Sequence, residues 1–163
     1  MARAAHAAGA AVIDLARTID LPVGPDEAWT ALWDVPAVAR CLPGLQSVEE
    51  IEPHHRYRAT VKDKVGPFSV AVTLDVTVNP SPAERLLRVS AAGRDSVLGS
   101  PVRMSMTACV TERAAGGSHL ALDGHAEVGG KLAALGQAVI HRKTRDVLDT
   151  FARNLGAMLA ARG

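Results

Sequence analysis

The sequence predicts an α+β domain in which a curved antiparallel sheet of six to seven strands is closed by one long C-terminal helix. Hydrophobic residues recur with a period of two from Leu45 to Val128, and Gly129-Gly130 ends that pattern. An apolar stripe of helical period then runs from Leu132 to about Ala160. A helix of near 29 residues spans about 43 Å and crosses such a sheet from end to end. We therefore expect sheet and helix to enclose an apolar space.

Length and composition indicate one domain with a real core. The chain has 163 residues, of which 48% are hydrophobic but only 3% are aromatic, so Val, Leu, Ala and Met must fill the interior. Unbranched Met adapts to irregular gaps, so such a core can leave a flexible apolar cavity. We assign residues 1–11 to a flexible N-terminal tail and residues 12–163 to a single ligand-binding domain.

The first elements are a strand and two short helices. Residues 12–21 alternate loosely, which indicates a strand, and Gly24-Pro25-Asp26 supplies a turn and a helix start. Pro36 begins a second short helix over residues 37–41, and Pro43-Gly44 ends it. Both short helices therefore follow the first strand.

Six further strands follow, separated by turns rich in Gly and Pro, one of them at Asn79-Pro80-Ser81-Pro82. Alternation within each strand predicts one buried and one solvated face. Consecutive strands of this kind form an antiparallel meander. The predicted strands are residues 46–52, 57–65, 68–78, 86–93, 102–112 and 119–128.

The inward positions of these strands, with the apolar stripe of the helix, predict the ligand contacts. Met and aromatic side chains among them suit a flat hydrophobic ligand, although they suit a filled core equally well. The residues that we expect to line the space are Tyr57, Val61, Asp63, Phe68, Val70, Val72, Leu87, Met104, Met106, Leu122, Leu135, Val139 and Phe151.

Charge and motif content argue against several partners. The net charge is +1 without a basic cluster, which speaks against nucleic acid. The sequence contains no transmembrane segment of 18 apolar residues, and peripheral membrane contact stays open. Cys41 and Cys109 stand alone without an export signal, so we expect reduced thiols and a cytoplasmic protein, with the inner face of the membrane as an option. The spacing of the histidines predicts no metal site, and we expect no cofactor.

No catalytic residue is predicted, because no nucleophile, base and acid stand in a recognisable order. Asp63 shares the inward phase with Tyr57 and Val61. It could orient a ligand hydroxyl or act as a base, but solvent exposure or pairing with Lys or Arg near the strand end is the favoured interpretation. His141, at the edge of the helix stripe, either projects into the cavity or, as we favour, lies on the helix surface.

Three segments of the chain form a distinctive set in register with the predicted elements. They are Cys41-Leu42-Pro43-Gly44, Lys62-Asp63-Lys64-Val65-Gly66-Pro67 and Val128-Gly129-Gly130-Lys131-Leu132-Ala133-Ala134-Leu135-Gly136. Together these segments resemble the CoxG family of carbon monoxide dehydrogenase subunits, which belongs to the SRPBCC superfamily and is similar to START and Bet v 1 proteins. The resemblance covers residues 13–159 and implies a helix-grip fold with a deep hydrophobic cavity. It also implies an accessory role for molybdenum-containing carbon monoxide dehydrogenase and related hydroxylases.

Three functions follow as hypotheses. The favoured one is a non-catalytic carrier of a lipid or quinone-like molecule that serves a carbon monoxide dehydrogenase-type enzyme. The second is an enzyme of the polyketide cyclase and dehydratase kind, in which Asp63, Tyr57 or His141 acts on an aromatic precursor. The third is a docking module of a multisubunit oxidoreductase that uses the short helices around Trp29, Trp33 and Leu42.

Overall fold

A computed structural model describes residues 10–162 of the chain. Residues 1–9 of the predicted tail therefore lie outside the described residues. The strands are β1 (Ala10–Leu21), β2 (Leu45–Glu52), β3 (Arg56–Val65), β4 (Phe68–Ser81), β5 (Leu86–Asp95), β6 (Pro101–Glu112) and β7 (Ser118–Gly129). The helices are α2 (Pro25–Leu32), α3 (Val35–Ala39), η1 (Pro82–Glu84), α4 (Gly130–Ala133) and α5 (Gln137–Arg162).

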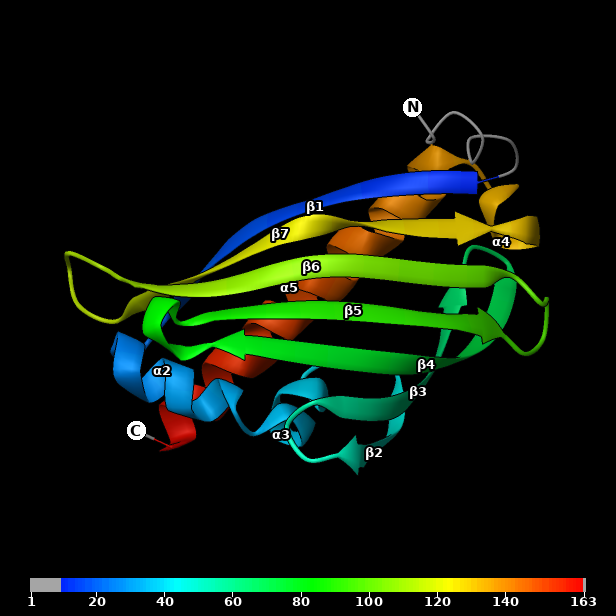
Figure 1. Ribbon diagram of the computed structural model, residues 1–163. Coiled ribbons are helices and arrows are strands. Elements are labelled where there is room, and N and C mark those ends of the chain that lie inside the picture. The colour runs from blue at the N-terminus through cyan, green and yellow to red at the C-terminus, as the bar shows by residue number, and fades with distance from the viewer. Residues whose placement is uncertain (1–9, 163) are drawn as a thin grey trace, which may run out of the picture.

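The described strands form one antiparallel sheet in the order β1-β7-β6-β5-β4-β3-β2. Helix α5 crosses one face of this sheet obliquely, and α2 and α3 lie at the end where the C-terminus emerges (Figure 1). The predicted α+β architecture is therefore confirmed, with seven strands. Tight turns join the strands from β2 onward in a meander, and β7 pairs with β1, so the first and last strands of the chain are neighbours in the sheet.

The predicted single helix is wrong at its start, because the chain breaks at Gly136. This glycine has a φ of 98°, which lies in the left-handed region that favours Gly. The amides of Leu135 and Gly136 donate to the carbonyls of Leu132 and Ala133, which ends α4 before α5 begins. Leu135 therefore lies in the break instead of on the helix stripe.

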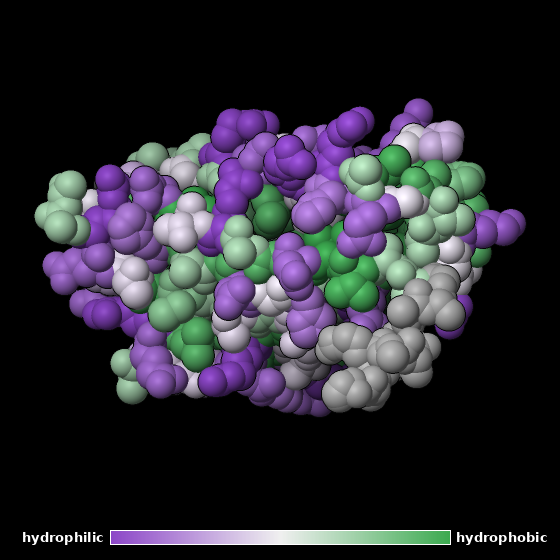
Figure 2. All heavy atoms as spheres, turned by 90° about the horizontal axis from the view of Figure 1, so that it is seen from above, coloured by the Kyte–Doolittle hydropathy of each residue, from purple (hydrophilic) through white to green (hydrophobic). Residues whose placement is uncertain are grey.

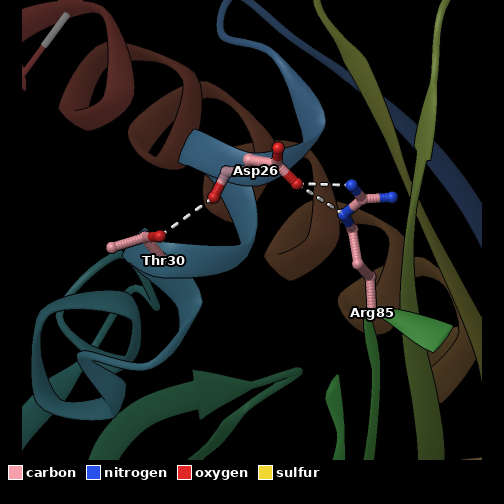
Figure 3. A network of polar contacts seen from close by, with 3 residues as sticks. All are labelled: Asp26, Thr30 and Arg85. Atoms are coloured by element: carbon pink, nitrogen blue, oxygen red, sulfur yellow. Dashed lines mark hydrogen bonds and ion pairs between the residues drawn. The ribbon is translucent and has the colours of Figure 1, made fainter. Parts of the chain in front are cut away.

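The predicted turn at Asn79 to Pro82 also starts later than expected. Strand β4 continues through Pro80 to Ser81 and pairs with β5, and η1 makes the turn instead. Arg85, just after η1, has a φ of 49° and bonds the carboxylate of Asp26 at the start of α2 (Figure 3). This contact ties the β4–β5 turn to α2, where Thr30 also donates to the Asp26 carbonyl oxygen at 3.0 Å.

Two hydrophobic clusters hold α5 against the sheet. The small cluster, Ala11, Ile13, Leu15 and Ile140, seals β1 against the first part of α5. The large cluster fills the end covered by α2 and α3, and Leu155 and Leu159 of α5 are its most deeply buried helical residues. Its buried members are Ile19, Leu21, Val23, Ala28, Ala31, Leu32, Cys41, Tyr57, Val78, Leu87, Ala108, Val110, Leu120, Leu122, Phe151, Leu155 and Leu159.

Two glycines on the inner face let neighbouring strands approach closely. A Cβ at Gly93 would clash with the carbonyl oxygen of Thr73, and one at Gly124 would clash with that of Ser105. Only Gly fits where another backbone comes this near. Both positions leave the inner face without a side chain in the middle of the sheet, opposite α5.

Candidate functional site

A set of apolar side chains on the inner face of the sheet and on the facing helical segment belongs to neither cluster and is only partly buried. We call this set the open strip. Within the sheet its members are neighbours, because Val61 pairs with Val72, and Leu74 pairs with Gly93, which pairs in turn with Val102. The members of the open strip are Val61, Phe68, Val72, Leu74, Val102, Leu135, Val139 and Val147.

The β3–β4 turn lies against the beginning of α5 and covers one side of the open strip. A Cβ placed on Gly66 would lie 3.6 Å from side-chain carbons of both Leu135 and Val139, which is ordinary van der Waals contact. Gly66 has a φ of 58°, as this tight turn requires. The turn and the helix thus meet without a covalent or hydrogen-bonded link, and the contact is apolar.

An ion pair joins β3 to α5 next to this contact. Lys143 Nζ lies 2.7 Å from Asp63 Oδ2, and the two side chains are 29% and 30% exposed. The Asp63 Oδ1 atom also accepts a hydrogen bond of 2.8 Å from the amide of Lys64. The favoured interpretation of Asp63, pairing with a basic residue, agrees with this geometry.

The surroundings of Asp63 keep its carboxyl ionised. Burial acts to raise its pKa, but the hydrogen bond from Lys143, the Lys64 amide and the positive charge of Lys143 together outweigh burial. The net pKa is therefore lower than usual. A carboxylate stabilised in this way is a weak base at neutral pH and a poor proton donor.

The thirteen residues predicted as ligand contacts divide into three groups. Tyr57, Leu87, Leu122 and Phe151 are members of the large cluster and pack against protein. Met104 and Met106 pack against the small cluster, and Met106 also contacts the large one. The remaining residues lie in or beside the open strip: Val61, Asp63, Phe68, Val70, Val72, Leu135 and Val139.

The acid–base candidates of the enzyme hypothesis do not meet. Tyr57 and Asp63 stand six residues apart on β3, which places them about 20 Å apart. The Tyr57 hydroxyl donates to Glu50 at 3.4 Å, and burial, then the nearby Glu50 charge, raises the pKa of Tyr57. His141 is exposed on α5, beside β1. Burial also raises the pKa of the Cys41 thiol, which opposes a role as nucleophile.

Two hollows lie on the outside of the sheet and helix. One, of about 420 Å³, lies on the outer face of β4 to β7 and is lined by polar side chains such as Arg88, Asp123 and His125. The other, of about 160 Å³, lies between β1 and α5 beside His141. Neither is the deep hydrophobic cavity that the resemblance implies. The surface seen with β1 nearest carries small hydrophobic patches among hydrophilic side chains (Figure 2).

Buried polar residues fix the end of the sheet next to the open strip. The fully buried Asp95 accepts hydrogen bonds from the amides of Ala71, at 2.7 Å, and Leu98. Ser100, also buried, accepts from the amide of Leu132 in α4 at 3.1 Å. Sequence reasoning missed both roles, because only the fold brings the β5–β6 loop beside β4 and α4.

The short helices are tied into the core. Trp29 and Leu42 pack against the large cluster, and the rings of Trp29 and Trp33 meet edge to face at 6.0 Å. Trp33 also contacts the ring of His54 at 5.1 Å. These side chains therefore have a packing role that does not depend on a partner protein.

Metal-binding side chains do not gather within residues 10–162. No group of three or more His, Cys, Asp or Glu side chains in this range could hold a metal ion. No helix in the same range is both long and apolar enough to cross a membrane.

Comparisons with known proteins agree on one fold. The model of the CoxG family of carbon monoxide dehydrogenase subunits matches residues 18–160. A conserved protein from Geobacillus kaustophilus is similar with a TM-score of 0.79 and 22% identity, over 90% of this chain and 94% of that one. No curated protein sequence matches the chain.

Two further solved structures extend the likeness to the START and Bet v 1 type of fold. A START superfamily protein from Mycobacterium smegmatis has a TM-score of 0.66 and 13% identity, over 93% of this chain and 99% of that one. The Zhui aromatase/cyclase from Streptomyces sp. R1128 has a TM-score of 0.61 and 14% identity, over 93% and 95%. At these identities the likeness concerns the fold alone, which agrees with the predicted helix-grip architecture.

Proposed function

Because the chain belongs to the CoxG family of carbon monoxide dehydrogenase subunits, we propose that it carries a hydrophobic small molecule between its sheet and α5. A lipid or a quinone-like compound is the ligand class, and a carbon monoxide dehydrogenase-type molybdenum hydroxylase is the enzyme served. The protein acts as an accessory factor, without catalysis of its own, in the cytoplasm or at the inner face of the membrane.

The open strip is the observation that supports this proposal. Val61, Val72 and Leu74 point inward by strand phase but remain partly exposed, which is unusual for the inner face of a sheet that a helix covers. Gly93 and Ala91, on the same face, carry little or no side chain. A ligand that covered these side chains would remove apolar area from water at about 25 cal/mol per Å², before ordering costs.

Entry of a ligand requires movement, because protein side chains occupy the inner face in this structure. The contact of the β3–β4 turn with Leu135 and Val139 is small and apolar, and Gly136 supplies a flexible point at the start of α5. Met104 and Met106 can change rotamer at low cost. The turn and the beginning of α5 are therefore the parts that separate.

Native mass spectrometry of the purified protein, followed by organic extraction, tests the carrier function. We expect a bound hydrophobic compound, and titration with the neutral fluorophore N-phenyl-1-naphthylamine should show one saturable site. Val72→Asn should weaken that binding at least about tenfold. Thr73→Asn, on the outer face of the same strand, is the matched control and should leave it unchanged. No bound compound and no saturable site would overturn the proposal.

The partner enzyme is tested separately with a tagged full chain. In an extract of cells that express a carbon monoxide dehydrogenase-type hydroxylase, we expect the tagged chain to retain subunits of that enzyme, while the tag alone retains none. A chain that still holds its ligand but retains no such subunit would contradict the accessory role and leave the carrier function in place.

A further inference from the structure

The charged pair of β3 and α5 lies among side chains that are otherwise apolar. Asp63 is next to Val70 across the β3–β4 pair, and along β3 the inward positions on either side of it are Val61 and Val65. Lys143 lies on α5 four residues after Val139 and four before Val147, so it shares a helix face with both. Strand phase and helix phase thus direct both charges toward the open strip.

Stability alone does not account for this pair. Two charges in a partly buried position lose hydration, and well-packed hydrophobic residues in their place often leave a protein as stable or more stable. A second ion pair already joins the sheet to α5 on the opposite side, where Arg17 Nη2 lies 2.6 Å from Asp149 Oδ1. The Asp63–Lys143 pair on the β3 side is therefore a candidate for a polar contact with a bound ligand.

We propose that Asp63 and Lys143 form the head-group subsite for the carried ligand and select a neutral amphiphile with a carbonyl or hydroxyl oxygen over an anionic one. This inference rests on the proposed carrier function. The Lys143 ammonium has three donors, so it can hold Asp63 Oδ2 and donate to a ligand oxygen at the same time. The apolar part of the ligand then lies along Val61, Val72 and Val147.

Charge neutrality is the basis of the selection. Asp63 cancels the charge of Lys143 at 2.7 Å, so a carboxylate ligand would gain little from Lys143 and would meet repulsion from Asp63. A neutral carbonyl or hydroxyl keeps its hydrogen bond to Lys143 without that repulsion. Removal of the Asp63 charge alone should therefore remove most of the preference.

Displacement of N-phenyl-1-naphthylamine by hexadecan-1-ol and by hexadecanoate, two ligands of equal chain length, tests this subsite at neutral pH. The unaltered protein should bind the alcohol at least about tenfold more tightly than the carboxylate. Asp63→Asn should improve binding of the carboxylate about tenfold and change binding of the alcohol by less than about threefold. Lys143→Gln should weaken binding of the alcohol. In the double variant with Asp63→Asn, it should also abolish the gain in affinity for the carboxylate.

Asp149→Asn, which breaks the ion pair on the β1 side of α5, is the matched control and should leave the ratio of the two affinities unchanged. An unchanged ratio in Asp63→Asn, with both ligands still bound, would overturn the head-group subsite and leave the carrier function intact. Failure of the unaltered protein to bind either ligand or the fluorophore would instead count against the carrier function. Thermal unfolding of each variant shows whether it is folded.

Discussion

Single residues on the inner face determine how closely the strands approach. Gly93 pairs with Leu74 and Val102, and its missing side chain lets the Thr73 carbonyl lie where a Cβ would otherwise be. Gly156, in α5, has an ordinary helical backbone, and a Cβ added to it would meet no atom within 4 Å. The same residue type therefore has opposite energetic roles at these two positions.

Replacement of each glycine by Ala should separate these roles. We expect Gly93→Ala to lower the free energy of unfolding by about 2 kcal/mol or more, because the new methyl group overlaps backbone atoms. Gly156→Ala should raise it by about 0.5 to 1 kcal/mol, because Ala favours the helix. Urea unfolding followed by circular dichroism measures both changes, and equal stabilities for the two variants would contradict the close approach at Gly93.

The carboxyl of Asp63 should make stability depend on acid pH. Its pKa in the folded protein is lower than the ordinary 3.8, so its contribution is present at neutral pH and is lost as pH falls below about 4. Asp63→Asn should destabilise the protein by at most about 1 kcal/mol from pH 7 to 5, because the pair is partly solvated. The difference between the two proteins should shrink toward pH 3.

Urea unfolding at pH 7, 5 and 3 measures this difference. Asp75→Asn is the control, because Asp75 also pairs with a basic residue but is 69% exposed; it should change stability by only a few tenths of a kcal/mol. A difference between unaltered protein and Asp63→Asn that grows below pH 4 would be the wrong sign for a carboxyl whose pKa is lowered on folding.

Helix α5 has two different halves along the same apolar stripe. Its second half, with Phe151, Leu155 and Leu159, is buried in the large cluster. Its first half carries Val139, Lys143 and Val147, which are partly exposed and face the β3–β4 side of the sheet. The second half of the helix thus serves as an anchor, whereas the first half presents the open strip and is anchored to β1 through Ile140.

Truncation to Ala in each half should distinguish anchoring from ligand contact. Leu155→Ala should cost about 2 to 5 kcal/mol of stability, because Leu155 is completely buried. Val147→Ala should cost about 1 kcal/mol or less, yet it should weaken binding of N-phenyl-1-naphthylamine more than Leu155→Ala does. The measurements are urea unfolding and fluorescence titration below the unfolding transition. A large stability loss in Val147→Ala would mean that this half is also filled core.

The molecule as a unit is a sheet that contacts α5 along both sides. On one side, β1 contacts α5 through the small cluster and the Arg17–Asp149 pair. On the other side, β3 contacts it through the Asp63–Lys143 pair, and the β3–β4 turn contacts it through Gly66. The end covered by α2 and α3 is filled by the large cluster. The β3–β4 side has the weaker packing, so we expect it to respond most to a ligand.

A ligand that binds only the folded protein should raise its melting temperature. At a free concentration of 100 Kd the added stability is about 2.7 kcal/mol, which corresponds to roughly 5 to 11 °C for a chain of this length. Scanning calorimetry with and without hexadecan-1-ol measures the shift, and Val72→Asn should show little of it. Hydrogen exchange should slow mainly in β3, β4 and the beginning of α5; slowing confined to the outer face of β5 to β7 would place the ligand elsewhere.

The local pattern was sufficient for the elements and the faces. Period-two alternation predicted the strands and their inward residues. In a strand with one buried face, every second side chain is apolar and points inward, as Val70, Val72 and Leu74 do. The helical stripe predicted α5 in the same way. The break at Gly136 was missed, since a single glycine is compatible with a helix interior as well as with its end.

Tertiary structure decided which inward residues are core and which remain partly exposed. Tyr57 and Val61 lie on the same strand and the same face. The helices α2 and α3 and the second half of α5 cover Tyr57 but not Val61. The partner of Asp63 lies 80 positions along the chain, and the amides that bind Asp95 come from β4 and its own loop. Local sequence determines the face to which each side chain points. Which of the inward side chains become covered, and which distant residues pair, depends on how the sheet curves around α5, and no single segment encodes that curvature.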